Sequence, residues 1–177
     1  MTDVYVTINA PLGPIDRGDR FADPLEELLA DKVRDFEITG GGTPIGKSGL
    51  TTCDIDMAFE GDADAVLPII IAALEKLGAP KGSSARAGGK DKVVKFGSAE
   101  GVAVHVPASG EAPAISDVID QLNSAVSGVG EFWTGWTNPT EAVLCFYGSS
   151  AVRMRELLMP VLDGSSSAHG WRFEPLT

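Results

Sequence analysis

Residues 51–80, TTCDIDMAFEGDADAVLPIIIAALEKLGAP, decide the fold class, because a strand pattern runs directly into a helix pattern. Every second residue from Cys53 to Phe59 is apolar, which is typical of a strand with one buried face. Asp62 is the expected N-cap of a helix that continues to Leu77, where a glycine and a proline end it. This stretch predicts a sheet covered by helices.

Outward from this stretch, the first half of the chain supplies the remaining elements of one small domain. Residues 4–8 alternate as a strand, and Asp23 with Pro24 predicts a helix that begins with Asp23 as its N-cap. Residues 36–39 predict a short strand, and a last strand falls at 83–87 or at 93–96. The order is β-α-β-β-α-β, the split βαβ pattern.

The second half repeats this order of elements without a clear repeat of residues. Alternation predicts strands at 102–106, 131–137, 141–147 and 171–174, and helical spacing predicts helices at 116–126 and 149–162. The predicted fold class is therefore α+β, with two ferredoxin-like halves in tandem. We expect an N-terminal half at residues 1–88 and a C-terminal half at 89–177.

Composition agrees with a folded, cytoplasmic chain. Of the 177 residues, 44% are hydrophobic and 22% are charged, which is ordinary globular usage. The start, MTDVYVTINA, lacks the features of a signal peptide, and the longest apolar stretch is far shorter than a membrane span requires. Cys53 and Cys145 both lie in apolar alternating runs, which predicts buried free thiols.

The charge distribution indicates what kind of partner the protein can bind. A net charge of −11 argues against nucleic acid and anionic lipid, and it favours a basic partner. Residues 48–75 and 96–152 each carry six acids and no lysine or arginine. Between these tracts, residues 76–95 hold six of the 14 basic residues, and their glycine content predicts a solvated linker.

Two groups of residues are candidates for partner contact. Alternation in the strand at 131–137 places Phe132 and Trp136 on one face and Trp133 on the other, and an exposed tryptophan is a favoured interface anchor. Packing in the core or between the halves is the alternative for these rings. In the first half, the sheet face opposite the apolar one is expected to be acidic. Its predicted residues are Tyr5, Thr7, Glu37, Thr52, Asp54, Asp56 and Glu60.

Motifs for catalysis, nucleotides and metals are weak. Gly41–Ser48 fits the spacing of a phosphate-binding loop, but a strand pattern follows it where a helix must begin, so we expect a hairpin. The only histidines, His105 and His169, have no ligand partner at helical spacing, and the carboxylates of a strand lie too far apart for a tight metal site. We therefore predict no catalytic residue, no cofactor and no metal.

Five short stretches resemble a family of uncharacterised bacterial α+β proteins that look like toxin immunity proteins. The stretches are Ile38–Thr43 (ITGGGT), Cys53–Asp56 (CDID), Leu77–Gly82 (LGAPKG), Phe96-Gly97 with Glu100-Gly101, and Phe146–Gly148 (FYG). The resemblance implies an acidic antidote that binds and blocks an antibacterial toxin.

The resulting hypothesis is a non-enzymatic, cytoplasmic immunity protein that neutralises a cognate protein toxin with a basic surface, without binding nucleic acid or membrane. The predicted contact residues are Asp54, Asp56, Glu60, Trp133 and Trp136. One alternative is a regulatory module that holds a small molecule or nucleotide between the halves. Another is an enzyme that uses the Gly41–Ser48 loop.

Overall fold

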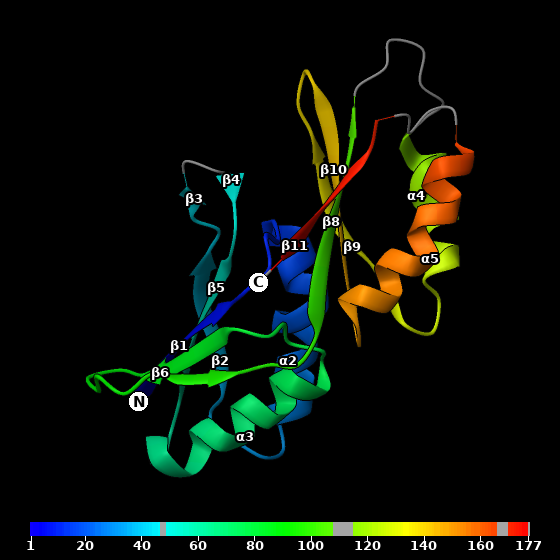
Figure 1. Cartoon of the computed structure of the whole chain (residues 1–177). Coiled ribbons are helices and arrows are strands. Elements are labelled where there is room, and N and C mark those ends of the chain that lie inside the picture. The colour runs from blue at the N-terminus through cyan, green and yellow to red at the C-terminus, as the bar shows by residue number, and fades with distance from the viewer. Residues whose placement is uncertain (47–48, 108–114, 166–169, 177) are drawn as a thin grey trace. The chain divides into compact units, whose positions relative to one another are not determined.

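The computed structural model describes residues 1–46, 49–107, 115–165 and 170–176. The chain divides into two compact units, Met1–Ser98 and Ala99–Thr177 (Figure 1). Within the described residues, no helix is both long enough and apolar enough to cross a membrane.

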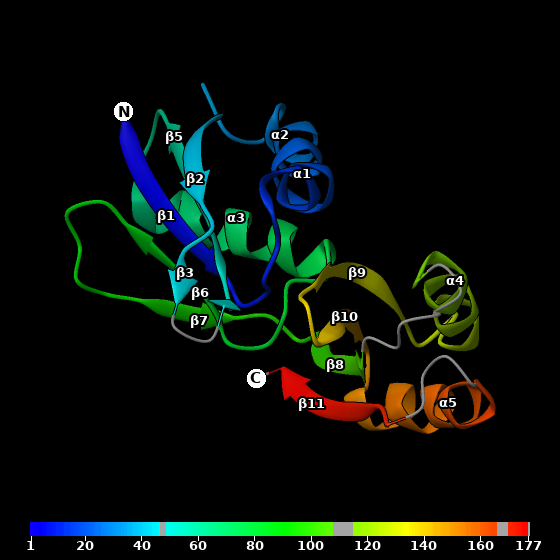
Figure 2. The same cartoon turned by 90° about the horizontal axis from the view of Figure 1, so that it is seen from above.

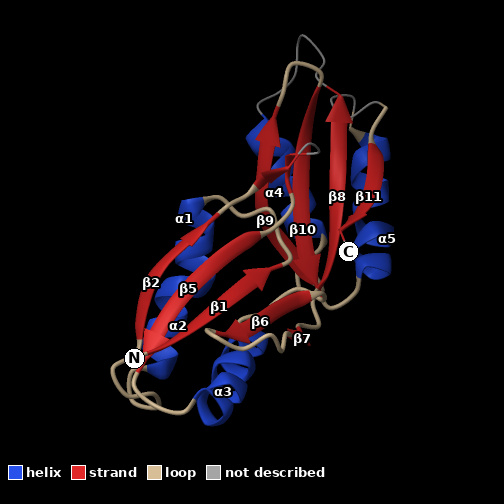
Figure 3. Cartoon of the chain, turned by 90° about the vertical axis from the view of Figure 1, so that its left-hand side faces the viewer, coloured by secondary structure: helices blue, strands red, loops and turns tan. Residues whose placement is uncertain are grey.

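The first unit contains a five-stranded antiparallel sheet in the order β2-β5-β1-β6-β7 (Figure 3). The first four strands in that order have the arrangement of a ferredoxin-like sheet, so the predicted fold class is confirmed for this unit. The sequence left 83–87 and 93–96 as alternatives for the last strand, and both segments form strands, β6 and β7, which pair with each other. The strands are β1 (Thr2–Ile8), β2 (Glu37–Gly42), β5 (Cys53–Phe59), β6 (Ser83–Ala87) and β7 (Val94–Phe96).

One face of this sheet is covered by helices, and the apolar positions of the strands point toward them. The alternation in β5 is confirmed, because Cys53, Ile55, Met57 and Phe59 are all fully buried. The helix α3 (Ala63–Lys76) begins as predicted, with the Asp62 carboxylate accepting a hydrogen bond from a backbone N–H of its first turn.

The first helical segment begins at Pro14, well before the start that the sequence predicts at Asp23. It consists of α1 (Pro14–Arg17), a π-helical turn η1 (Gly18–Ala22) and α2 (Asp23–Leu29). Asp23 has helical backbone angles and is not the N-cap, so that prediction is wrong. The earlier start has a physical reason: a proline is favourable in the first turn of α1, and Phe21 of the π turn is fully buried.

The boundary between the units also differs from the predicted one after residue 88. Residues 94–96 pair with β6 of the first sheet, so the chain leaves the first unit only after Ser98. Residues 76–95 are therefore not a solvated linker, because they contain β6 and the first two residues of β7.

The second unit has a four-stranded antiparallel sheet in the order β11-β8-β10-β9, the ferredoxin-like order of a β-α-β-β-α-β chain (Figure 3). Helices α4 (Ile115–Ala125) and α5 (Ala151–Gly164) lie together on one side of it (Figure 2). Leu144 and Phe146 of the central strand β10 pack in one core with Leu122 of α4 and Leu158 of α5. The strands are β8 (Glu100–Pro107), β9 (Gly130–Thr137), β10 (Glu141–Gly148) and β11 (Arg172–Leu176).

The segment with the phosphate-loop spacing forms a hairpin and not the start of a helix. Gly41 lies in β2, and the short strands β3 (Ile45–Gly46) and β4 (Gly49–Leu50) pair with each other. Lys47 and Ser48 lie outside the described residues. The described residues of this segment, 41–46 and 49–50, contain no helix N-terminus, which the anion site of a phosphate loop requires.

Candidate functional site

The face of the first sheet that points away from its helices carries the polar residues of four strands in register. The central residue of one row is Tyr5 of β1, which lies opposite Asp56 of β5 on one side and Arg86 of β6 on the other. Gly40 of β2 lies opposite Asp56 and continues the row to the edge of the sheet. Because opposite residues in a sheet point to the same side, these side chains lie next to one another.

A second row lies two residues along the strands and has Thr7 at its centre. Thr7 is opposite Asp54 on β5 and Ser84 on β6, with Gly42 beyond Asp54 and Lys95 beyond Ser84. The Thr7 hydroxyl donates a 2.7 Å hydrogen bond to Oδ1 of Asp54. This bond fixes one carboxylate oxygen and leaves the other free to accept.

The charges on this face are separated by strand. Asp3 and Glu37 lie in a third row on either side of Ala58, so four acids fall on β1, β2 and β5. The two basic residues in these rows, Arg86 and Lys95, fall on β6 and β7. We call the four acids, Asp3, Glu37, Asp54 and Asp56, the acidic strip.

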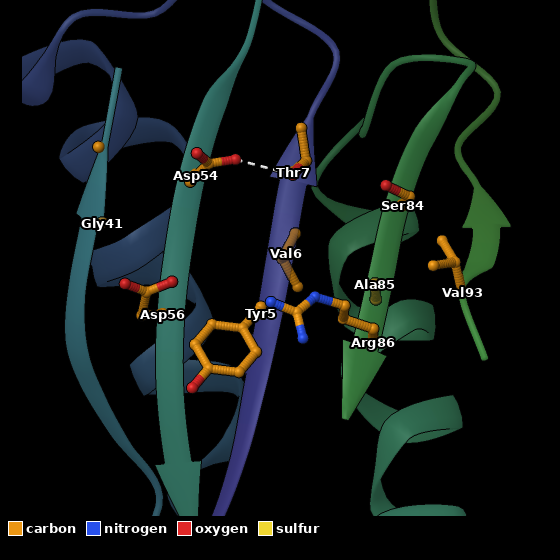
Figure 4. Close-up of a pocket in the computed structure, with 11 residues that line it drawn as sticks. Tyr5, Val6, Thr7, Gly41, Asp54, Asp56, Ser84, Ala85, Arg86 and Val93 are labelled. Atoms are coloured by element: carbon orange, nitrogen blue, oxygen red, sulfur yellow. Dashed lines mark hydrogen bonds between the residues drawn. The ribbon is translucent and has the colours of Figure 1, made fainter. Parts of the chain in front are cut away.

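A hollow of about 530 Å³ lies over the first two rows (Figure 4). Tyr5, Asp54, Asp56 and Arg86 all line it. The guanidinium carbon of Arg86 lies 4.4 Å from the centre of the Tyr5 ring, within the range of a cation–π contact. The Asp56 carboxylate makes no hydrogen bond or ion pair with any residue that the structure describes, although Asp56 is only partly exposed.

Glu60, which the alternation places on the same face, does not line the hollow. It follows the last residue of β5, and its carboxylate lies 3.0 Å from Nε of Arg34 in an exposed ion pair. The structure therefore brings Asp54 and Asp56 together with Tyr5 and Arg86, and it leaves Glu60 outside the group.

Trp133 and Trp136 do not alternate with Phe132 as predicted, because β9 carries a β-bulge. Phe132 lies opposite Phe146 in the core, but the register shifts within the pair of strands, so Trp136 lies opposite Val143 on the other face. The prediction that Phe132 and Trp136 share a face is wrong. Trp133 is buried, with its ring stacked on Tyr147 at 4.3 Å, and it is not an exposed anchor.

A polar cluster in the second unit was not visible in the sequence. His105 of β8 is mostly buried, with Nδ1 2.7 Å from Nη2 of Arg172 and Nε2 3.1 Å from Oε2 of Glu174. Its Nδ1 also lies 3.2 Å from Oε1 of Glu141. Because arginine only donates, a neutral His105 accepts at Nδ1 and donates from Nε2 to Glu174, whereas a protonated one donates to both carboxylates.

The cluster gives one pH-dependent expectation. The hydrogen bond from His105 is the largest cause that lowers the pKa of Glu141, and the nearby charges of His105 and Arg172 act in the same direction. A lowered folded-state pKa means that this carboxylate stabilises the fold above its unfolded pKa and loses that effect as the pH falls. In His105→Leu, we expect the pKa of Glu141 to rise toward the ordinary value of 4.5. Carboxyl NMR titration measures this directly, and identical Glu141 curves in the two proteins would contradict the assignment.

The cysteines do not form a nucleophilic site. Burial is the main cause that raises the pKa of Cys53 and of Cys145, in each case to about 12. Both are free thiols, which agrees with the sequence-based expectation. We expect Ellman's reagent to leave both unmodified in the native protein at pH 8 and to modify both in concentrated urea, because only the thiolate reacts. Rapid modification of either thiol before unfolding would show that the site is open.

Metal binding has no structural support within the described ranges. Across these residues, no three histidine, cysteine, aspartate or glutamate side chains are grouped so that they could hold an ion.

Comparison with known proteins finds only distant structural similarity. No protein-family model matches the sequence, and no curated protein matches it. Structural similarity to the first two RRM domains of a yeast poly(U) binding protein has a TM-score of 0.30 at 8% identity, covering 98% of this chain and 99% of that one. The regulatory subunit of aspartate kinase from Thermus thermophilus gives 0.29 at 12% identity, covering 90% and 89%. An anthrone oxidase-like protein gives 0.29 at 10% identity, covering 98% and 89%. TM-scores this low support no statement about function.

Proposed function

We propose that this chain is a non-enzymatic binding protein that neutralises an antibacterial toxin in the cytoplasm by direct contact, and that the acidic strip is its contact surface. The observation that carries the proposal is the placement of Asp3, Glu37, Asp54 and Asp56 on one open sheet face. None of these side chains belongs to the apolar core, and Asp54 and Asp56 form no ion pair within the described residues.

Electrostatic complementarity supports a basic partner. Acidic residues arranged on one face steer a positively charged surface toward it and raise the association rate. Toxins that act on nucleic acid need a basic cleft, and an acidic surface can occupy such a cleft. The net charge of −11 adds a long-range attraction to any positively charged partner. The family resemblance in the sequence supports the choice of a toxin as the partner class.

The test begins with affinity capture from the native host, using the full chain as bait. We expect a basic protein to be retained, and we expect its expression alone to stop growth while co-expression with this chain restores it. We expect less of this protein to be retained at high salt than at low salt, because screening weakens contacts between exposed charges. If the retained protein is harmless to cells, or if no basic protein is retained, the proposed function is wrong.

A further inference from the structure

We infer that the hollow over Tyr5 is a recognition pocket for one arginine side chain of the partner. This inference rests on the proposed function, since it names the group that the acidic strip receives. Four features of the hollow carry it: two carboxylates, their spacing, an aromatic ring and a glycine-lined side.

The carboxylates are available to a cation from outside. The carboxylate of Asp56 has no hydrogen-bond or ion-pair partner in the described part of the chain. Asp54 accepts one hydrogen bond from Thr7, which fixes one of its carboxylate oxygens in the lining of the hollow. Together they place two negative charges in the lining of the hollow.

The spacing of the two acids favours a guanidinium over an ammonium group. They occupy alternate positions of β5, so their backbones are separated by about 6.6 Å along the strand. An ammonium is a compact point charge that fits best against one carboxylate. A guanidinium is a wide, planar group with five N–H donors, and it can donate to both carboxylates at once.

The ring of Tyr5 provides the third contact. It lies in register between Asp56 and Arg86, and Figure 4 shows the ring between these two side chains. The guanidinium carbon of Arg86 lies 4.4 Å from the centre of this ring, so the ring already makes a cation–π contact on the β6 side. On the β5 side, the neighbours of the ring are Asp54 and Asp56 and not a basic residue, so their carboxylates attract an incoming guanidinium to that side.

On the side of the edge strand β2, the hollow is lined by Gly41 and Gly42. Gly40 and Gly42 lie beside the two acids and have no side chains to block entry. A Cβ atom added at Gly42 would meet no other atom within 4 Å, and its backbone is not in the left-handed region. Gly42→Leu is therefore expected to fill the hollow without straining the fold.

The experiment uses N-acetyl-L-arginine methylamide as the probe, titrated into the isotope-labelled full chain and followed by amide NMR shifts. We expect saturable shifts at Tyr5, Gly42 and Asp56. The neutral citrulline analogue should bind at least tenfold more weakly. Asp56→Asn and Gly42→Leu should each weaken the arginine probe at least tenfold. Gly164→Leu is the matched control, because Gly164 is exposed at the end of α5 with free space around its Cβ position.

The pocket is overturned if the arginine probe gives no saturable shifts, if the citrulline analogue binds equally well, or if arginine binding is unchanged in Asp56→Asn or in Gly42→Leu. Amide spectra of each variant separate a blocked pocket from an unfolded protein. The pocket and the proposed function also fail separately. If a captured toxin binds the chain but the probe does not, the arginine pocket is wrong and the binding function stands. If the probe binds and no toxin is retained, the pocket stands and the toxin assignment is wrong.

Discussion

Replacing Asp54 and Asp56 together by lysine is expected to weaken binding of the captured partner by a factor on the order of 100 or more. The change converts two acids of the hollow into two bases beside Arg86, so attraction to a basic partner becomes repulsion. Placing like charges against each other in an interface costs several kcal/mol, and about 1.4 kcal/mol corresponds to tenfold in affinity. Isothermal titration calorimetry of the purified partner measures the effect.

The control for this variant is Asp117→Lys with Asp120→Lys. Both residues are exposed on α4 of the second unit, and the double replacement changes the net charge by the same amount. We expect the control to retain most of the affinity, with a small loss from the general change of charge. Equal losses in the two double variants would mean that only net charge matters and that the acidic strip is not the contact surface.

Replacing Phe146 by alanine is expected to lower the free energy of unfolding by about 3–5 kcal/mol, the usual range for a fully buried aromatic ring. Phe146 lies on the central strand β10 of the second sheet, is fully buried, and meets Phe132 edge to face at 5.6 Å. Its removal leaves a cavity between the sheet and both helices of that unit. Urea unfolding measures the change.

Val152→Ala is the comparison for this core variant. Val152 lies on α5 and is 69% exposed, so its truncation should change stability by no more than about 0.5 kcal/mol. A loss below about 1 kcal/mol for Phe146→Ala would contradict the described core, since a ring of that size cannot be removed from a packed interior so easily.

Where one face of a strand is buried, the sequence predicted the structure well. The alternation of Cys53, Ile55 and Met57 identified both the inward face of β5 and the outward position of Asp54 and Asp56, because the side-chain period of a strand is two. The same alternation failed at Trp136, because a β-bulge inserts one residue and moves every later side chain to the other face. No local signal marks that bulge.

The polar cluster around His105 could not be predicted, because its members meet only through the pairing of strands that are distant in sequence. The partners of His105 lie on β10 and β11, and Arg172 is 67 residues away in sequence, so the cluster arises only when the strands are in register. Arg86 lay both in a candidate strand at 83–87 and in a glycine- and lysine-rich stretch that predicted a solvated linker. The structure has the strand β6 there, and Ala85 and Ala87 on either side of Arg86 are buried.

Site-specific photo-crosslinking tests the central claim most directly. A photoreactive amino acid in place of Glu37 lies on the acidic strip, and one in place of Asp120 lies on the outer helix face of the second unit. With the captured partner present, we predict a covalent adduct from position 37 and none from position 120. An adduct from position 120 alone would contradict the assignment of the first sheet as the contact surface.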